Sequence, residues 1–143
     1  MTPRQKQYYC KMYFPLVNFD FVTMVANAND EIVAVGLGMP SLSDALRKCR
    51  GRLFPFGWYH LIKALRAKRM TDFDLLLIAV RPDYQDKGVT ALIFNEMTPY
   101  FTKYGVQRVE TTSILETNHK NQANFTAYDH IQHKRRRAYT KEL

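Results

Sequence analysis

The stretch LLLIAVRPDYQDKGVTALIF, residues 75–94, decides the fold because it passes from one regular structure to another within a few residues. Its unbroken apolar run predicts a central strand over Phe73–Val80 with both faces buried. A polar turn with a single glycine follows, and apolar residues then recur at helical spacing. The pattern predicts a helix over Gly88–Tyr104, with Gly105 placed to end it.

The predicted turn leads into a helix N-terminus, where the first backbone N–H groups have no partner within the helix. Together with the positive end of the helix dipole, these donors form a binding site for an anion. A glycine at position 88 lets the backbone approach a bound group closely. The chain has no P-loop pattern, and Gly36–Ser41 lacks the third glycine of a dinucleotide-binding turn.

The remaining segments also show helical or strand patterns. The chain opens with a predicted helix over Thr2–Tyr13, in which Thr2 is the N-cap and Pro3 the first helical residue. Two further helices are predicted over 41–48, capped by Ser41, and over Asn121–His130. The predicted strands, the first two joined as a hairpin, are Phe21–Asn27, Glu31–Met39, Gln107–Leu115 and Arg136–Lys141. This order predicts one α+β domain over residues 1–143.

Residues 54–70 predict an amphipathic, basic helix with Trp58, Ile62 and Leu65 on one face. Such a helix can lie on a membrane surface. We favour the alternative, in which the apolar face packs on the sheet and the basic side faces water.

The net charge of +8 is concentrated in two segments. Residues 41–70 contain eight Lys and Arg residues against Asp44 alone, and residues 131–143 contain five against Glu142. These basic segments suggest an anionic partner or a polyanionic cofactor nearby. Solvated charge without a partner is the alternative for both.

The cysteines and histidines do not form a metal-binding or disulfide pattern. Cys10 and Cys49 are two thiols far apart in the sequence, and His130 and His133 lack a third ligand at metal-binding spacing. No secretory leader opens the chain, and its longest apolar run is too short to cross a bilayer. We therefore expect a cytoplasmic protein without a metal.

The sequence resembles the GCN5-related N-acetyltransferase (GNAT) superfamily. Val80–Ala91 is similar to the acyl-CoA-binding turn [Q/R]-x-x-G-x-[G/A], with Gln85 and Gly88 in place, but Thr90 stands where the family has Gly or Ala. Residues 114–128, ILETNHKNQANFTAY, resemble the second core strand and following helix. The resemblance covers about residues 17–141, and the segment RLFPFGWYHLIKALRAKR before the central strand resembles a GNAT-like branch of longer bacterial proteins.

The resemblance implies a mixed, mostly antiparallel central sheet flanked by helices, with the N-terminal part of the fold reduced or missing. It implies an N-acetyltransferase that transfers an acetyl group directly from acetyl-CoA, its co-substrate, to an unidentified amine. The N-terminal remainder of a longer chain, or a second copy, would complete the domain. Neither a membrane nor nucleic acid is expected as a partner. The alternative function is a non-catalytic module that binds CoA or nucleic acid through its basic surface.

The resemblance also assigns residues to roles. Tyr128 is the candidate acid for the leaving thiolate, and Glu116 the candidate base, with Asp74 as the second choice. Core packing is the alternative for Tyr128, and contact with solvent is the alternative for both carboxylates. The residues expected to bind acetyl-CoA, through backbone N–H groups or polar side chains, are Ile78, Ala79, Val80, Gln85, Asp86, Lys87, Gly88, Val89, Thr90, Ala91, Asn118 and Asn121.

Overall fold

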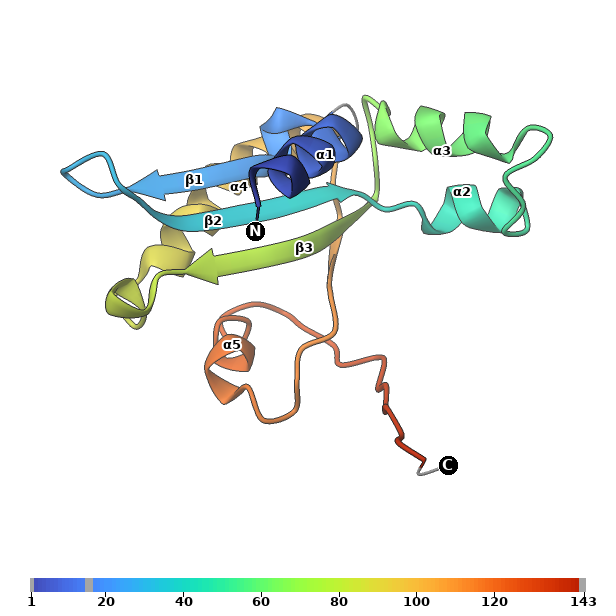
Figure 1. The fold of residues 1–143 in the computed structure, drawn as a ribbon. Coiled ribbons are helices and arrows are strands. Elements are labelled where there is room, and N and C mark those ends of the chain that lie inside the picture. Colours follow the sequence, from blue (N-terminus) through green and yellow to red (C-terminus); the bar gives the residue numbers. More distant parts are fainter. Residues whose placement is uncertain (1, 15–16, 142–143) are drawn as a thin grey trace.

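The computed structural model describes residues 2–14 and 17–141 and contains a four-stranded sheet with the strand order β1-β2-β3-β4 (Figure 1). The strands are β1 (Val22–Ala26), β2 (Ile32–Pro40), β3 (Asp72–Val80) and β4 (Arg108–Thr111). β1, β2 and β3 are antiparallel neighbours, whereas β4 runs parallel to β3. The α+β class and the mostly antiparallel sheet predicted from the sequence are therefore confirmed.

Five α-helices accompany the sheet in the described part of the chain. They are α1 (Pro3–Tyr13), α2 (Ser43–Lys48), α3 (Gly57–Leu65), α4 (Val89–Tyr104) and α5 (His119–Ala123). Two short 3-10 turns, Phe19–Phe21 and Pro82–Tyr84, precede β1 and α4.

The first helix and the first hairpin form as predicted. Thr2 caps α1 with its side chain, which accepts from the Gln5 backbone N–H. The Gln5 side chain accepts in turn from the Thr2 backbone N–H, which completes a capping box. Pro3 is the first helical residue. β1 and β2 pair through a tight turn at Asn27–Asp30, in which the Asn27 side chain accepts from two backbone N–H groups.

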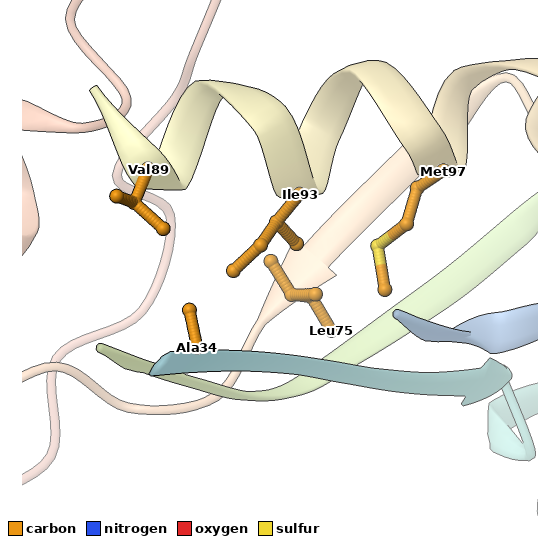
Figure 2. Packing of buried hydrophobic residues seen from close by; sticks show 5 residues of the cluster. All are labelled: Ala34, Leu75, Val89, Ile93 and Met97. Atoms are coloured by element: carbon orange, nitrogen blue, oxygen red, sulfur yellow. The ribbon is translucent and has the colours of Figure 1, made fainter. Parts of the chain in front are cut away.

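The main core lies between α4 and one face of the sheet. Val89, Ile93 and Met97 recur on one side of α4 and contact Ala34 and Leu75 of the strands (Figure 2). All five are buried, and Ile93 and Met97 have no exposed surface. This packing holds the N-terminus of α4 at the end of β3.

The prediction that both faces of β3 are buried is wrong. β3 is an inner strand, but its side chains alternate between the α4 side, where Leu75 is 3% exposed, and the opposite face, where Leu77 is 50% exposed. An apolar run without alternation cannot distinguish a strand covered on both faces from one whose second face lies open.

The prediction that the basic helix packs on the sheet is also wrong. α3 packs mainly on α2, and the two helices project beyond the end of the strands (Figure 1). Trp58 and Ile62 are accordingly 48% and 40% exposed. Ser41 does not cap α2, because Leu42 occupies the N-cap position without a side-chain hydrogen bond.

The C-terminal elements are shorter than predicted. β4 ends at Thr111 rather than Leu115, and α5 ends at Ala123, so Tyr128 follows it in a turn. Residues 136–141 form no strand and are exposed. In the part of the chain that the structure describes, no helix is long and apolar enough to cross a membrane.

The contact between β2 and α4 makes a direct prediction at Gly36. A Cβ atom at this position would overlap the Ile93 side chain and press on Met97. Gly36→Ala should therefore lower the free energy of unfolding by about 1–3 kcal/mol in a urea titration, since overpacking strains a dense core. Val35→Ile is the control, because it adds a methylene on the opposite face of β2. It should change the free energy of unfolding by less than about 0.5 kcal/mol. Equal losses in the two variants would contradict this packing.

Candidate functional site

The parallel strands β3 and β4 separate partway along β3. Their pairing covers only Asp72–Leu75 of β3, and Thr112 closes it by donating its backbone N–H to the Leu75 carbonyl and its hydroxyl to the Leu76 carbonyl. The register with β2 shifts at the same place, where Leu76 is an extra residue on β3. Such a bulge redirects a strand. The remainder of β3, as far as Val80, therefore continues without a strand beside it on this edge.

Backbone groups of Ile78 and Val80 point to this open edge. Arg81 donates its N–H to the Val33 carbonyl on the β2 side, and successive residues of a strand alternate in direction. Ala79 therefore faces β2, while Ile78 and Val80 face away from it. The Gln85 side chain donates to the Val80 carbonyl at 3.2 Å, which agrees with this assignment.

The turn after β3 ends in the N-terminus of α4. Two of its residues, Asp86 (φ 59°) and Gly88 (φ 74°), adopt the left-handed conformation. Gly88 is the N-cap residue and supplies no side-chain cap. The first N–H groups of a 16-residue helix, at Val89 and Thr90, thus lack a side-chain cap at this end. Space for a Cβ at Gly88 is open for at least 4 Å, so the approach to the turn is unobstructed.

Charged side chains border the turn. Lys120 of α5 donates to the Asp86 carboxylate at 2.7 Å, and Lys87 lies over the Tyr84 ring at 5.3 Å. Arg81 instead holds Asp83 and Glu31 at 2.7 and 3.2 Å, which lowers the pKa of the Asp83 carboxyl. Lys120 and Lys87 are therefore the cations best placed to meet an anion at the turn.

α5 closes the gap that the separating strands leave. A small cavity of about 30 Å³ lies there, and Ile78, Thr112, Asn121 and Phe125 are among its lining residues. The structure thus brings the predicted residues Ile78 and Asn121 together. Asn118 has a different role, because its side chain caps α5 by accepting from the Asn121 N–H at 3.1 Å.

Tyr128 packs on α4. Its ring lies 5.5 Å from that of Phe94, edge to face, and its side chain is about half exposed. Phe125 makes a similar contact with Phe94 at 6.0 Å. These two rings hold the segment after α5 against the first half of α4. The prediction that Tyr128 lies in a helix is wrong.

The two candidate bases lie in different environments. Glu116 is in a turn rather than at a strand end; its side chain is 73% exposed, with Arg135 at 3.8 Å. Asp74 lies on β3 beside Glu110 of β4. Burial raises the pKa of the Asp74 carboxyl, a Ser41 hydrogen bond opposes this, and the Glu110 carboxylate adds to it. Asp74 is four residues from Ile78, roughly 13 Å along the strand.

The basic segments do not gather at the turn. The segment 41–70 forms α2 and α3, which project from the end of the sheet where β3 begins, whereas the turn follows the end of β3 (Figure 1). In the C-terminal segment, Lys134 donates to Glu110 at 2.6 Å. A role for either segment in holding an anion at the turn is therefore not supported by this geometry.

Sequence reasoning missed Lys120, Thr112 and the bulge at Leu76. Lys120 stands between the two predicted asparagines, but only the fold brings it to Asp86. The bulge has no signal in a run of three leucines, and Thr112 has none in a β-branched segment.

Comparison with known proteins gives one similarity of low identity. No family model matches the chain, and no solved structure matches it significantly. Protein YghO of Escherichia coli (strain K12) is 27% identical over 103 residues, which make up 69% of this chain and 26% of that protein. The chain thus spans about a quarter of the length of this relative, and an identity this low does not establish a family.

Two aspartates on β3 should have opposite effects on stability. The folded-state pKa of Asp74 is raised, so this carboxyl favours folding most below its ordinary pKa and loses that contribution as the pH rises through the raised value. A hydrogen bond from Arg108 lowers the pKa of the Asp72 carboxyl in the folded state. The ionised Asp72 therefore stabilises the fold above its ordinary pKa, and this stabilisation is lost as the pH falls through the lowered value.

Thermal unfolding at about pH 3 and pH 7 tests both signs. Asp74→Asn should raise the Tm relative to the unsubstituted protein at pH 7 and leave it nearly unchanged at pH 3. Asp72→Asn should lower the Tm at pH 7, with the difference shrinking at pH 3. A lower Tm for Asp74→Asn at pH 7 would show that its charged form is stabilised in the fold.

Proposed function

We propose that this chain is a GNAT-like domain that binds acyl-CoA and transfers an acetyl group to an amine. One observation carries the proposal: the uncapped N-terminus of α4 follows directly on a strand edge that opens where β3 and β4 separate. A helix terminus binds phosphate, and an open strand edge binds an extended amide-containing chain. A CoA thioester has both parts, joined end to end.

In this proposal the turn holds the pyrophosphate. The backbone N–H groups of Gly88, Val89 and Thr90 supply the donors, and Lys87 and Lys120 supply positive charge. On binding, Lys120 would leave the Asp86 carboxylate and pair with the phosphate instead. Thr90 brings a β-branched side chain to this site, where the GNAT pattern has Gly or Ala.

Ile78 and Val80 would pair with the pantetheine arm and polarise the reacting carbonyl. Bound acetyl-CoA supplies a thioester that an amine attacks directly. The Tyr128 hydroxyl would donate a proton to the departing sulfur, and a carboxylate, Asp74 or Glu116, would accept the proton of the amine, directly or through water. Asn121, in the wall of the small cavity, would contact the same arm.

The first test compares two glycines at opposite ends of α4. Gly88 and Gly105 have nearly the same φ, 74° and 73°, and neither would place a Cβ within 4 Å of a neighbouring atom. Gly88→Val and Gly105→Val should therefore lose similar stability through backbone strain. Only Gly88→Val should also weaken CoA binding in calorimetry, by about tenfold or more, or about 1.4 kcal/mol. Equal affinities in the two variants would remove the turn from the site.

The second test concerns Tyr128. Tyr128→Phe keeps the ring against Phe94 and removes the hydroxyl, so it should lower kcat while the Kd for CoA changes little. Tyr139→Phe is the control, since that side chain is 81% exposed. If Tm and CoA affinity fall together in Tyr128→Phe, the tyrosine packs the fold and does not act as an acid.

The second candidate function is a non-catalytic module that binds CoA or nucleic acid through its basic surface. The exposure of Glu116 and the distance of Asp74 from Ile78 favour it, because neither carboxylate is held beside the open edge. CoA affinity without turnover on a panel of amines would select the CoA-binding module. Salt-dependent RNA binding without CoA affinity would select the nucleic-acid version.

A further inference from the structure

We propose that the projecting helices α2 and α3 dock on the surface of a membrane that contains anionic phospholipids. The docking surface, here called the basic hairpin, comprises residues 43–69 and includes both helices and the loop between them. The loop lies at the end of the hairpin that is farthest from the sheet (Figure 1). The expectation of no membrane partner assumed that α3 packs on the sheet, whereas α3 packs mainly on α2.

Apolar side chains gather at this far end of the hairpin. In the loop, Phe54 is 82% exposed and Phe56 is 71% exposed, and Leu53 beside them is also exposed. The exposed residues Trp58 and Ile62 extend this surface along α3, because residues four apart lie on the same side of a helix. The tip of the hairpin and one side of α3 therefore present aromatic and aliphatic groups to the surroundings.

Hydrogen bonds satisfy several polar groups of the loop from within. The Leu53 carbonyl accepts from the Trp58 backbone N–H at 3.1 Å, and the Pro55 carbonyl accepts from the Trp58 indole N–H at 3.0 Å. The Phe56 carbonyl accepts from the Tyr59 backbone N–H at 3.2 Å. Polar groups that enter a lipid layer need partners within the protein. Three carbonyls at the apolar tip have such partners, which favours contact of this tip with lipid.

Positive charge accompanies the apolar tip. No Asp or Glu occurs in the sequence between Asp44 and Asp72. All Lys and Arg residues of the hairpin are exposed, and in the part of the chain that the structure describes only Arg47 pairs with a carboxylate, that of Asp44 at 3.4 Å. Arg50 and Arg52 directly precede the apolar residues of the loop. Cations beside exposed apolar groups are the composition of a surface that binds anionic lipid.

This combination favours a membrane over nucleic acid or another protein. Nucleic acid offers phosphates to the cations and bases to the aromatic rings, but little apolar surface to the exposed Leu46, Leu53 and Ile62. The core of a protein interface is depleted of charged residues, and of lysine in particular. A membrane accommodates both features, because the acyl chains take the apolar tip and the headgroups take the cations.

The tryptophan provides a local test. Trp58 is the only tryptophan of the chain, so its fluorescence reports on the proposed surface. With vesicles of phosphatidylcholine and phosphatidylglycerol, its emission should shift to shorter wavelengths, and the protein should sediment with the vesicles. Vesicles of phosphatidylcholine alone should give much smaller effects. Added salt should weaken the association, since it screens the attraction to anionic lipid.

One pair of variants tests the apolar contribution. Phe54→Ala combined with Phe56→Ala should lower the vesicle partition coefficient about tenfold or more, because it removes both rings from the tip. Leu115→Ala combined with Ile131→Ala, at exposed positions outside the hairpin, is the control and should leave the coefficient unchanged. Thermal unfolding checks that both variants are folded.

A second pair of variants tests the charge contribution. Arg52→Gln combined with Lys63→Gln should also lower the partition coefficient about tenfold or more. Arg137→Gln combined with Lys141→Gln removes the same charge from the C-terminal segment and should have a smaller effect.

Four results would overturn the proposal. They are no association with the anionic vesicles, association without a change in the Trp58 emission, equal losses in a hairpin variant and its control, and salt-dependent binding of single-stranded RNA without vesicle association. The last would assign the basic hairpin to nucleic acid. The inference does not depend on the proposed acetyltransferase activity, because the hairpin and the turn lie at opposite ends of β3 and the vesicle assays contain no CoA.

Discussion

The close approach of α4 to β2 determines where every other feature of the molecule can lie. It depends on Gly36, since any side chain there would occupy the space of Ile93. Ile93 and Met97 are fully buried in this contact, and Val89 extends it to the first turn of the helix. The helix N-terminus is thereby fixed beside the end of β3. Without this contact, the donors of the turn and those of the strand edge would have no defined relation.

The bulge at Leu76 is the second constraint. β4 leaves β3 at this residue, so the last part of β3 has polar backbone groups and no strand to pair with. Backbone groups in a protein interior need partners. α5 and Phe125 cover part of the gap, and the proposed acyl-CoA arm would use the rest. The open edge is therefore the part of the sheet that we propose for binding the acyl-CoA arm.

Local signals predicted the elements that local interactions determine. The cap at Thr2, the hairpin, the strand before the turn and the end of α4 at Gly105 all appear where the sequence indicates. Glycines with positive φ and caps act within a few residues, so their effects are visible in the sequence. The relation of Gln85 to Val80 is equally local, but its geometry was not foreseen.

Features that depend on long-range packing were not predicted from the sequence. α3 has an amphipathic pattern with Trp58 on its apolar face, and no local rule states whether that face packs on the sheet or lies in water. Contact between Lys120 and Asp86 depends on the path of the whole segment after β4. For the same reason the alternation of β3 was missed, because the face of β3 opposite α4 has the apolar residues of a covered face. The candidate site was thus predicted in its turn and strand and in the charged residues Asp86 and Lys87, but Lys120 was missed.

A titration of ¹⁵N-labelled protein with CoA, followed by amide NMR shifts, tests whether one ligand spans the helix terminus and the strand edge. Saturable shifts are expected at Gly88, Val89 and Thr90, together with Ile78 and Val80. Residues of α2 and α3 should not shift. Shifts confined to those two helices, or none at all, would show that CoA does not bind at the turn and the strand edge.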